Sequence, residues 1–123
     1  MEKLNILVVD DKKIIGDLFD FILGYCGHNI KCLYDPMEAL EVIKKQRFDI
    51  VFLDLIMPGK DGVQLLEEIR LSAPDLPVVM MSGYSVDEKR NKAQELGAVT
   101  CLKKPFEMED VRKVVKQVLG KDI

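Results

Sequence analysis

Six polar residues of this sequence lie at or just after the ends of short apolar runs, and their side-chain types suit phosphoryl transfer. They are Asp10, Asp11, Asp54, Ser82, Lys103 and Lys104. Carboxylates held close together repel one another, so a group of three must bind a proton or a cation. Oxygen ligands of this kind suit Mg²⁺, which keeps several waters and uses one or two carboxylates. A carboxylate beside Mg²⁺ and a lysine can attack a phosphoryl group, whose oxygens the cations neutralise and a hydroxyl can contact.

The apolar runs that precede these residues predict buried β-strands. Residues 6–9, 50–53 and 77–81 are apolar at consecutive positions and rich in β-branched side chains. Strands that are apolar on both faces are typical of a parallel sheet covered by helices on both sides. Weaker strand patterns occupy residues 30–34 and 99–102.

Helical patterns alternate with these strands. Their apolar or capping residues lie at positions 15–22, 35–38, 62–71, 85–97 and 111–119. Asp35 precedes a proline as an N-cap, Ser85 begins a capping-box spacing, and Gly120 follows the last apolar stripe as a stop. The pattern that begins at Ser85 contains few large apolar residues, so we predict a loosely packed helix there.

Strands that alternate with helices predict an α/β fold: a five-stranded parallel sheet with right-handed crossovers and five helices on both faces. In such a sheet, ligands bind outside the carboxyl ends of the strands, so the six polar residues should converge at one edge. A lone aspartate at a strand end is most often a helix N-cap. A pair of aspartates, a third one, a hydroxyl and a lysine at one edge are better explained by a functional site.

The length and the charge of the chain limit the alternatives. At 123 residues the chain forms about one domain, predicted to span residues 1–123. A hydrophobic fraction of 48% and a charged fraction of 32% are typical of a soluble globular protein. The formal net charge of −3 argues against nonspecific nucleic-acid binding.

The cysteines and the histidine do not predict a metal site. Cys26, Cys32 and Cys101 are odd in number and lack C-x-x-C spacing, so we expect free thiols in a reducing cytoplasm. His28 is the single histidine and is expected to be a loop residue. Neither a signal-peptide pattern nor an apolar stretch approaching 18 residues occurs, which predicts a cytoplasmic protein without membrane contact.

Four segments, taken together, resemble the receiver domain of two-component response regulators. They are residues 6–11 (ILVVDD), 52–62 (FLDLIMPGKDG), 80–83 (MMSG) and 103–106 (KKPF). Each segment is short, but the four occur in the family's order at the family's separations. The resemblance covers essentially the whole chain and implies a flavodoxin-like (βα)5 fold with strand order 2-1-3-4-5.

The resemblance implies a phosphoacceptor and a metal site. Asp54 would accept the phosphoryl group. Asp10, Asp11 and Asp54 would hold Mg²⁺, and the backbone carbonyl of Ile56 would complete the protein's share of the ligands. Some family members have a polar residue where this chain has Ile56. We predict slow self-dephosphorylation, because an apolar side chain there hinders the attack of water on the acyl phosphate.

The resemblance also implies a switch, from which this chain departs at one position. Ser82 would be the switch hydroxyl, and Lys104, with Lys103 as its neighbour, would contact the phosphoryl group. The peptide bond between Lys104 and Pro105 would be cis. The family commonly has Tyr or Phe three residues before this lysine, whereas this chain has Cys101. The aromatic part of the switch is therefore missing, while the hydroxyl part is retained.

The partners that the resemblance implies are proteins. A histidine kinase or a histidine phosphotransfer protein would supply the phosphoryl group in a Mg²⁺-dependent reaction. The surface of the fourth helix, fifth strand and fifth helix would then change for a downstream effector. The chain would be a phosphoacceptor rather than an enzyme, and a monomer or a weak dimer through that surface, without direct nucleic-acid contact.

Three other functions share parts of this pattern, and particular residues argue against each of them. A pseudo-receiver would bind partners without phosphate, which the complete set of five side chains that the resemblance assigns to the site argues against. A Mg²⁺ phosphohydrolase with an Asp nucleophile normally needs a second Asp two residues later, where this chain has Ile56. A flavodoxin-like FMN protein would bind phosphate after the first strand, where Asp10 and Asp11 would repel it.

Overall fold

A single parallel sheet forms the centre of the computed structural model, which describes residues 3–83 and 87–123. Its strands are β1 (Asn5–Val9), β2 (Asn29–Leu33), β3 (Ile50–Asp54), β4 (Val78–Ser82) and β5 (Thr100–Lys103). The order β2-β1-β3-β4-β5 confirms both the predicted α/β fold and the strand order that the resemblance implied. The observed strands differ from the predicted ones by about one residue, so Asp54 and Ser82 are the last residues of their strands.

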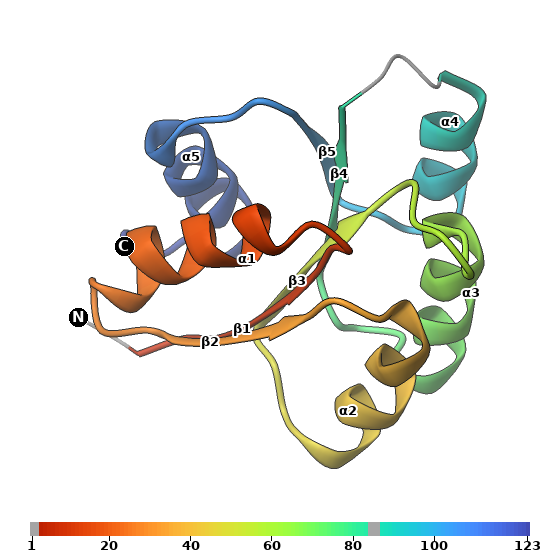
Figure 1. Ribbon diagram of the computed structural model, residues 1–123, viewed down its shortest axis with the longest axis horizontal. Coiled ribbons are helices and arrows are strands. Elements are labelled where there is room, and N and C mark those ends of the chain that lie inside the picture. The colour runs from red at the N-terminus through yellow and green to blue at the C-terminus, as the bar shows by residue number, and fades with distance from the viewer. Residues whose placement is uncertain (1–2, 84–86) are drawn as a thin grey trace.

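Helices cover both faces of the sheet, as predicted. They are α1 (Lys13–Phe19), α2 (Ala39–Lys45), α3 (Gly62–Ser72), α4 (Asp87–Glu95) and α5 (Met108–Leu119). α1 continues into a π-helix, η1 (Asp20–Gly24), and a 3₁₀ turn, η2 (Pro36–Glu38), leads into α2. Figure 1 shows α1 and α5 on one face and α2, α3 and α4 on the other.

The two layers of helices enclose two apolar cores because strand residues alternate between the faces of the sheet. In β3, Ile50 and Phe52 belong to the core under α1 and α5, and Val51 belongs to the core under α2 and α3. Phe19 of α1 contacts Phe52 with ring centroids 4.7 Å apart. Every residue of β3 and β4 is buried, which explains their continuous apolar sequences.

The helix boundaries follow the predicted signals where the structure describes them. The N–H of Met37 donates to Asp35 Oδ1 at 3.0 Å, which confirms the predicted N-cap. Gly120 ends α5 with φ 67°, in the left-handed region that glycine adopts without strain. The capping-box prediction at Ser85 lies outside the described residues. α4 buries Ala93 and presents a polar sequence, in agreement with the predicted loose packing.

His28 differs in its environment from what the sequence suggested. It lies in a loop, as predicted, but its side chain is only 5% exposed. The N–H of Leu4 donates to His28 Nδ1 at 3.0 Å, and burial lowers the pKa of the imidazole. A contact between residues 24 positions apart has no signature in a local pattern, which is why the burial was missed.

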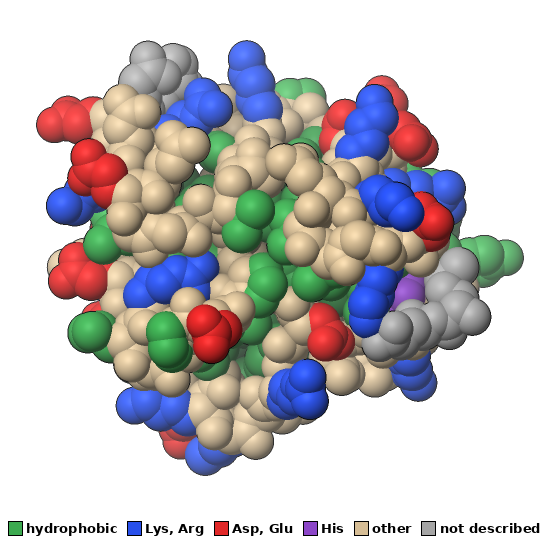
Figure 2. All heavy atoms as spheres, turned by 180° about the vertical axis from the view of Figure 1, so that it is seen from behind, with side chains coloured by type: hydrophobic (Ala, Val, Ile, Leu, Met, Phe, Trp, Pro, Cys, Tyr) green, Lys and Arg blue, Asp and Glu red, His purple; other side chains and the backbone are tan. Residues whose placement is uncertain are grey.

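The state of the cysteines and the distribution of surface charge agree with what the sequence predicted. Cys26, Cys32 and Cys101 are free thiols, as predicted. Figure 2 shows acidic and basic side chains interspersed over one face of the molecule. Among the residues that the structure describes, no helix has the length and apolar character needed to cross a membrane.

Candidate functional site

The residues singled out in the sequence lie at one edge of the sheet. Asp10 and Asp11 follow β1, Asp54 and Ser82 end β3 and β4, and Lys104 follows β5. The ladder continues to this edge, because the N–H of Lys104 donates to the Ser82 carbonyl at 2.7 Å. The side chains of Asp10, Asp54 and Ser82 are buried, although each carries a polar group. The predicted convergence is therefore present in the structure.

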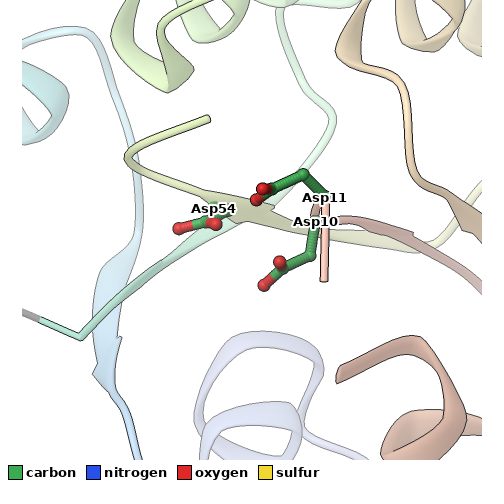
Figure 3. Close-up of side chains that lie close together, drawn as sticks. All are labelled: Asp10, Asp11 and Asp54. Atoms are coloured by element: carbon green, nitrogen blue, oxygen red, sulfur yellow. The ribbon is translucent and has the colours of Figure 1, made fainter. Parts of the chain in front are cut away.

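Three carboxylates meet in this position. Asp10, Asp11 and Asp54 each offer an oxygen within 4.8 Å of the others. Figure 3 shows the Asp10 and Asp11 side chains on opposite sides of the chain segment that carries them, with the Asp54 carboxylate facing both. The backbone fixes two of the groups: the Lys12 N–H donates to Asp10 Oδ1 at 2.9 Å, and the Ile56 N–H donates to Asp54 Oδ1 at 3.3 Å.

Lys104 supplies a positive charge to this cluster. Its Nζ lies 2.6 Å from Asp10 Oδ2 and 3.4 Å from Asp54 Oδ2. Burial and the neighbouring Asp10 carboxylate raise the pKa of Asp54 to about 6, although Lys104 and the Ile56 N–H act in the opposite direction. One lysine therefore does not balance the three carboxylates.

The oxygen atoms of the cluster fit a hard divalent cation. Asp11 Oδ1 and Asp54 Oδ2 are buried and accept no hydrogen bond from the described part of the chain, although Lys12 Nζ and Lys104 Nζ lie 3.7 Å and 3.4 Å from them. Leaving buried acceptors unsatisfied is costly unless a cation or water contacts them. Mg²⁺ binds carboxylate oxygens and keeps part of its water shell, so these residues fit it. The ligand role of the Ile56 carbonyl stays a prediction.

The loop after Asp54 turns back tightly against the end of β3. The Gly62 N–H donates to the Leu55 carbonyl at 3.1 Å, and the Val63 N–H donates to Asp61 Oδ1 at 2.8 Å, which caps α3. A Cβ atom at Gly62 would lie 2.2 Å from the backbone oxygen of Asp54. Glycine is therefore required next to the candidate acceptor, whereas the sequence showed Gly62 only as the first residue of a predicted helix.

The structure also shows where Lys103, Pro105 and Cys101 lie relative to this site. Lys103 ends β5 with an exposed side chain, so Lys104 is the lysine of the site. The bond between Lys104 and Pro105 is cis, as the resemblance implied. Cys101 is half-buried in β5 and lines a cavity beside α4. Burial raises the pKa of this thiol, and Arg90 opposes the shift.

Comparisons with known proteins agree with this geometry. Residues 6–116 match the family described as the response regulator receiver domain. The chain is 32% identical over 115 residues to a protein named sporulation initiation phosphotransferase F from Bacillus subtilis (strain 168). The match covers 94% of this chain and 93% of that protein.

Two solved structures show the same fold. NtrX from Brucella abortus superposes with a TM-score of 0.89 and 37% identity, over 97% of this chain and 27% of that chain. A CheY-like response regulator receiver domain protein from Methanospirillum hungatei JF-1 superposes with a TM-score of 0.91 and 27% identity, over 97% and 95% of the two chains. This chain thus spans 27% of the NtrX chain and 95% of the CheY-like protein.

Proposed function

Since this chain belongs to the response regulator receiver domain family, a family of signalling phosphoacceptors, we propose that Asp54 accepts a phosphoryl group from a phosphohistidine. One observation carries the proposal. Asp54 is a buried carboxylate whose Oδ2 accepts no hydrogen bond from the described residues but lies 3.4 Å from Lys104 Nζ, and two further carboxylates lie beside it. The name of the Bacillus relative, a phosphotransferase, supports a role in passing the phosphoryl group onward.

The reaction is a transfer between two nucleophiles. A new P–O bond forms at Asp54 Oδ2 while the P–N bond to the donor imidazole breaks, and the imidazole nitrogen keeps the electron pair and takes a proton. Asp54 must be ionised to attack, and a pKa of about 6 leaves it largely ionised at neutral pH. Lys104 Nζ, 3.4 Å from this oxygen, adds positive charge where the phosphoryl oxygens arrive.

A divalent cation belongs to the proposed site. Asp10, Asp11 and Asp54 would hold Mg²⁺ with the backbone carbonyl of Ile56. When bound, Mg²⁺ supplies the positive charge that lets an anionic phosphoryl group approach three carboxylates. The buried Asp11 Oδ1, which accepts no hydrogen bond from the described residues, supports this assignment.

Phosphorylation would change the position of the switch residue Ser82 and the surface around α4. The product carries about −1.5 to −2 of charge, by analogy with other phosphorylated side chains. Ser82, at the end of β4, would move toward Asp54 and donate a hydrogen bond from its hydroxyl to a phosphoryl oxygen. The surface of α4, β5 and α5 would then favour a second arrangement that a downstream partner or a second copy binds.

Mass spectrometry after treatment with acetyl phosphate and Mg²⁺ tests the proposal. We expect one phosphoryl adduct on the wild-type chain and none on Asp54→Asn. The matched control is Asp49→Asn, because Asp49 directly precedes the same strand at its opposite end and contacts the Asn5 N–H. That variant should still be labelled, and chelation of Mg²⁺ should abolish labelling of both the wild type and Asp49→Asn.

Two results would contradict the proposal. Absence of an adduct with both acetyl phosphate and a phosphohistidine protein as donor would show a binding module that works without phosphate. Multiple turnover on small phosphate esters would show a phosphohydrolase that uses the same aspartate as its nucleophile.

A further inference from the structure

We propose that the ion pair between Lys89 and Asp61 is a latch that holds α4 to the start of α3 and opposes phosphorylation of Asp54. Lys89 Nζ contacts Asp61 Oδ2 across 28 positions of sequence. The inference deepens the proposed function, and its link to phosphorylation rests on that function. That the pair holds α4 in place is a separate statement, which can be tested without any phosphoryl group.

Apolar packing alone holds α4 weakly. Within the described part of the helix, Ala93 is the fully buried apolar residue, and Leu96 just beyond the helix packs only partly against the core. A cavity of about 410 Å³ lies beside the helix and includes Met80 and Cys101 in its lining. Small side chains beside a cavity provide few dispersion contacts. The polar contacts at the two ends of α4 therefore contribute much of the interaction that holds the helix in position.

The C-terminal end of α4 is firmly attached. The Arg70 guanidinium donates through Nη2 to the Gly97 carbonyl at 3.0 Å and through Nη1 to the Leu76 carbonyl at 2.6 Å. Gly97 has φ +92°, and a Cβ there would lie 3.0 Å from Arg70 Nε. One half-buried side chain on α3 thus binds both the loop that leads into β4 and the turn that ends α4, which ties this end of α4 to α3.

The other end of α4 is attached through Lys89. Its partner, Asp61, has both carboxylate oxygens engaged, because Oδ1 accepts from the Val63 N–H at 2.8 Å and Oδ2 binds the lysine. The next residue, Gly62, packs against the backbone oxygen of Asp54 without room for a Cβ. The latch therefore fastens α4 to a segment that is itself fixed against the candidate acceptor. Figure 1 shows α3 and α4 as neighbours on this face.

Movement of Ser82 toward a phosphoryl group would act against the latch. Ser82 ends β4 and α4 begins at Asp87, and the proposal is that a displacement of this strand end shifts the start of α4. Lys89 bound to Asp61 keeps that start beside α3 instead. Because the coupling between two equilibria is reciprocal, loss of the latch must favour binding at the Asp54 site as much as binding there weakens the latch.

Hydrogen exchange of the α4 amides in the absence of Mg²⁺ tests the latch itself. We expect Lys89→Met to raise exchange in the first turns of α4 by up to about fivefold, the range typical of a partly exposed ion pair. Asp61→Asn should do the same, since an asparagine oxygen can still cap α3. The double variant should show no more than the larger single effect, because both changes remove one interaction. The matched control is Lys92→Met on the same helix, whose exposed pair with Glu95 spans 3.9 Å.

Binding of beryllofluoride, a phosphoryl analogue, with Mg²⁺ tests the coupling. Both latch variants should bind it up to about fivefold more tightly than wild type, and Lys92→Met should not. Unchanged α4 exchange in both variants overturns the latch, and faster exchange with unchanged beryllofluoride affinity overturns its coupling to Asp54. Failure of the proposed function is distinguishable, because the wild-type chain would then take no phosphoryl adduct, while the exchange experiment still decides whether the pair holds α4.

Discussion

Lys104 Nζ lies 2.6 Å from Asp10 Oδ2, although the two residues are 94 positions apart in the sequence. Both side chains are largely buried, at 14% and 1% exposed. Removing one partner of a buried ion pair leaves an uncompensated charge, which costs far more than the pair contributes net. This contact therefore makes Lys104 important for stability as well as for the proposed chemistry.

Lys104→Met should destabilise the fold in a pH-dependent way. At pH 7.5 the free energy of unfolding should fall by about 2–3 kcal/mol, because three carboxylates remain without the lysine. At pH 5.5 the loss should be smaller, since protonation of Asp54, whose pKa is raised to about 6, relieves part of the repulsion. Urea unfolding at both values measures this difference. Equal losses at the two values would show that repulsion among the carboxylates does not cause the destabilisation.

Asp54→Asn should stabilise the unphosphorylated protein at pH 7.5. The pKa of Asp54 is about 6 in the folded chain against an ordinary 3.8, so the folded state takes up this proton more readily than the unfolded state. Folding therefore carries a penalty above pH 6 that disappears as the pH falls toward 4. Asparagine removes the penalty, on the order of 2 kcal/mol, in thermal or urea unfolding without Mg²⁺. A variant no more stable than wild type at pH 7.5 would contradict the raised pKa.

His28 should make the fold less stable in mild acid. Burial lowers the pKa of the folded histidine below its ordinary 6.5, so the unfolded chain takes up the proton first as the pH falls. Stability is fully present above pH 6.5 and decreases below it, until the folded histidine also protonates. Protonation also removes the acceptor for the Leu4 N–H, a hydrogen bond worth about 1 kcal/mol.

His28→Asn isolates this effect, because an amide oxygen can accept the same hydrogen bond without titrating. Its free energy of unfolding should change less than that of wild type between pH 7 and pH 5. Parallel pH profiles for the two proteins would assign the acid sensitivity to other groups.

Gly62→Ala should unfold the protein or cost more than about 3 kcal/mol, because its Cβ would lie 2.2 Å from the Asp54 backbone oxygen. The matched control is Gly83→Ala, where the nearest atom to an added Cβ is Lys104 Cβ at 3.8 Å. Thermal unfolding of both variants measures the contrast. Similar melting temperatures for the two would show that the loop after Asp54 can shift to admit a side chain.

Ile56 should slow hydrolysis of the acyl phosphate. Its side chain is 41% exposed and follows Asp54 by two residues, where an apolar group disfavours an ordered water. Ile56→Asn should shorten the phosphate lifetime by up to about tenfold, equivalent to 1.4 kcal/mol of barrier. The decay of the labelled protein after removal of donor measures the rate. A wild-type half-life of only seconds would contradict the predicted slow self-dephosphorylation.

The fold was predictable because its signals are local. Continuous apolar runs such as residues 50–53 identify strands that are buried on both faces, and the rule that parallel strands share a functional edge brings Asp10, Asp54, Ser82 and Lys104 together. The resemblance to the family supplied the strand order, which no local pattern contains. Boundaries shifted by about one residue, because the ends of strands depend on which neighbours continue the ladder.

The sequence by itself therefore determined the residue types of the site, the edge on which they meet and the charge imbalance that calls for a cation. Only the tertiary structure decided which atoms contact one another: that Lys104 bonds to Asp10 more closely than to Asp54, that His28 is buried, and that Lys89 reaches Asp61. The physical reason is that these contacts join segments far apart in the chain. Their geometry depends on how helices and loops pack, to within an ångström, whereas spacing along the sequence fixes only the face or edge on which a residue lies.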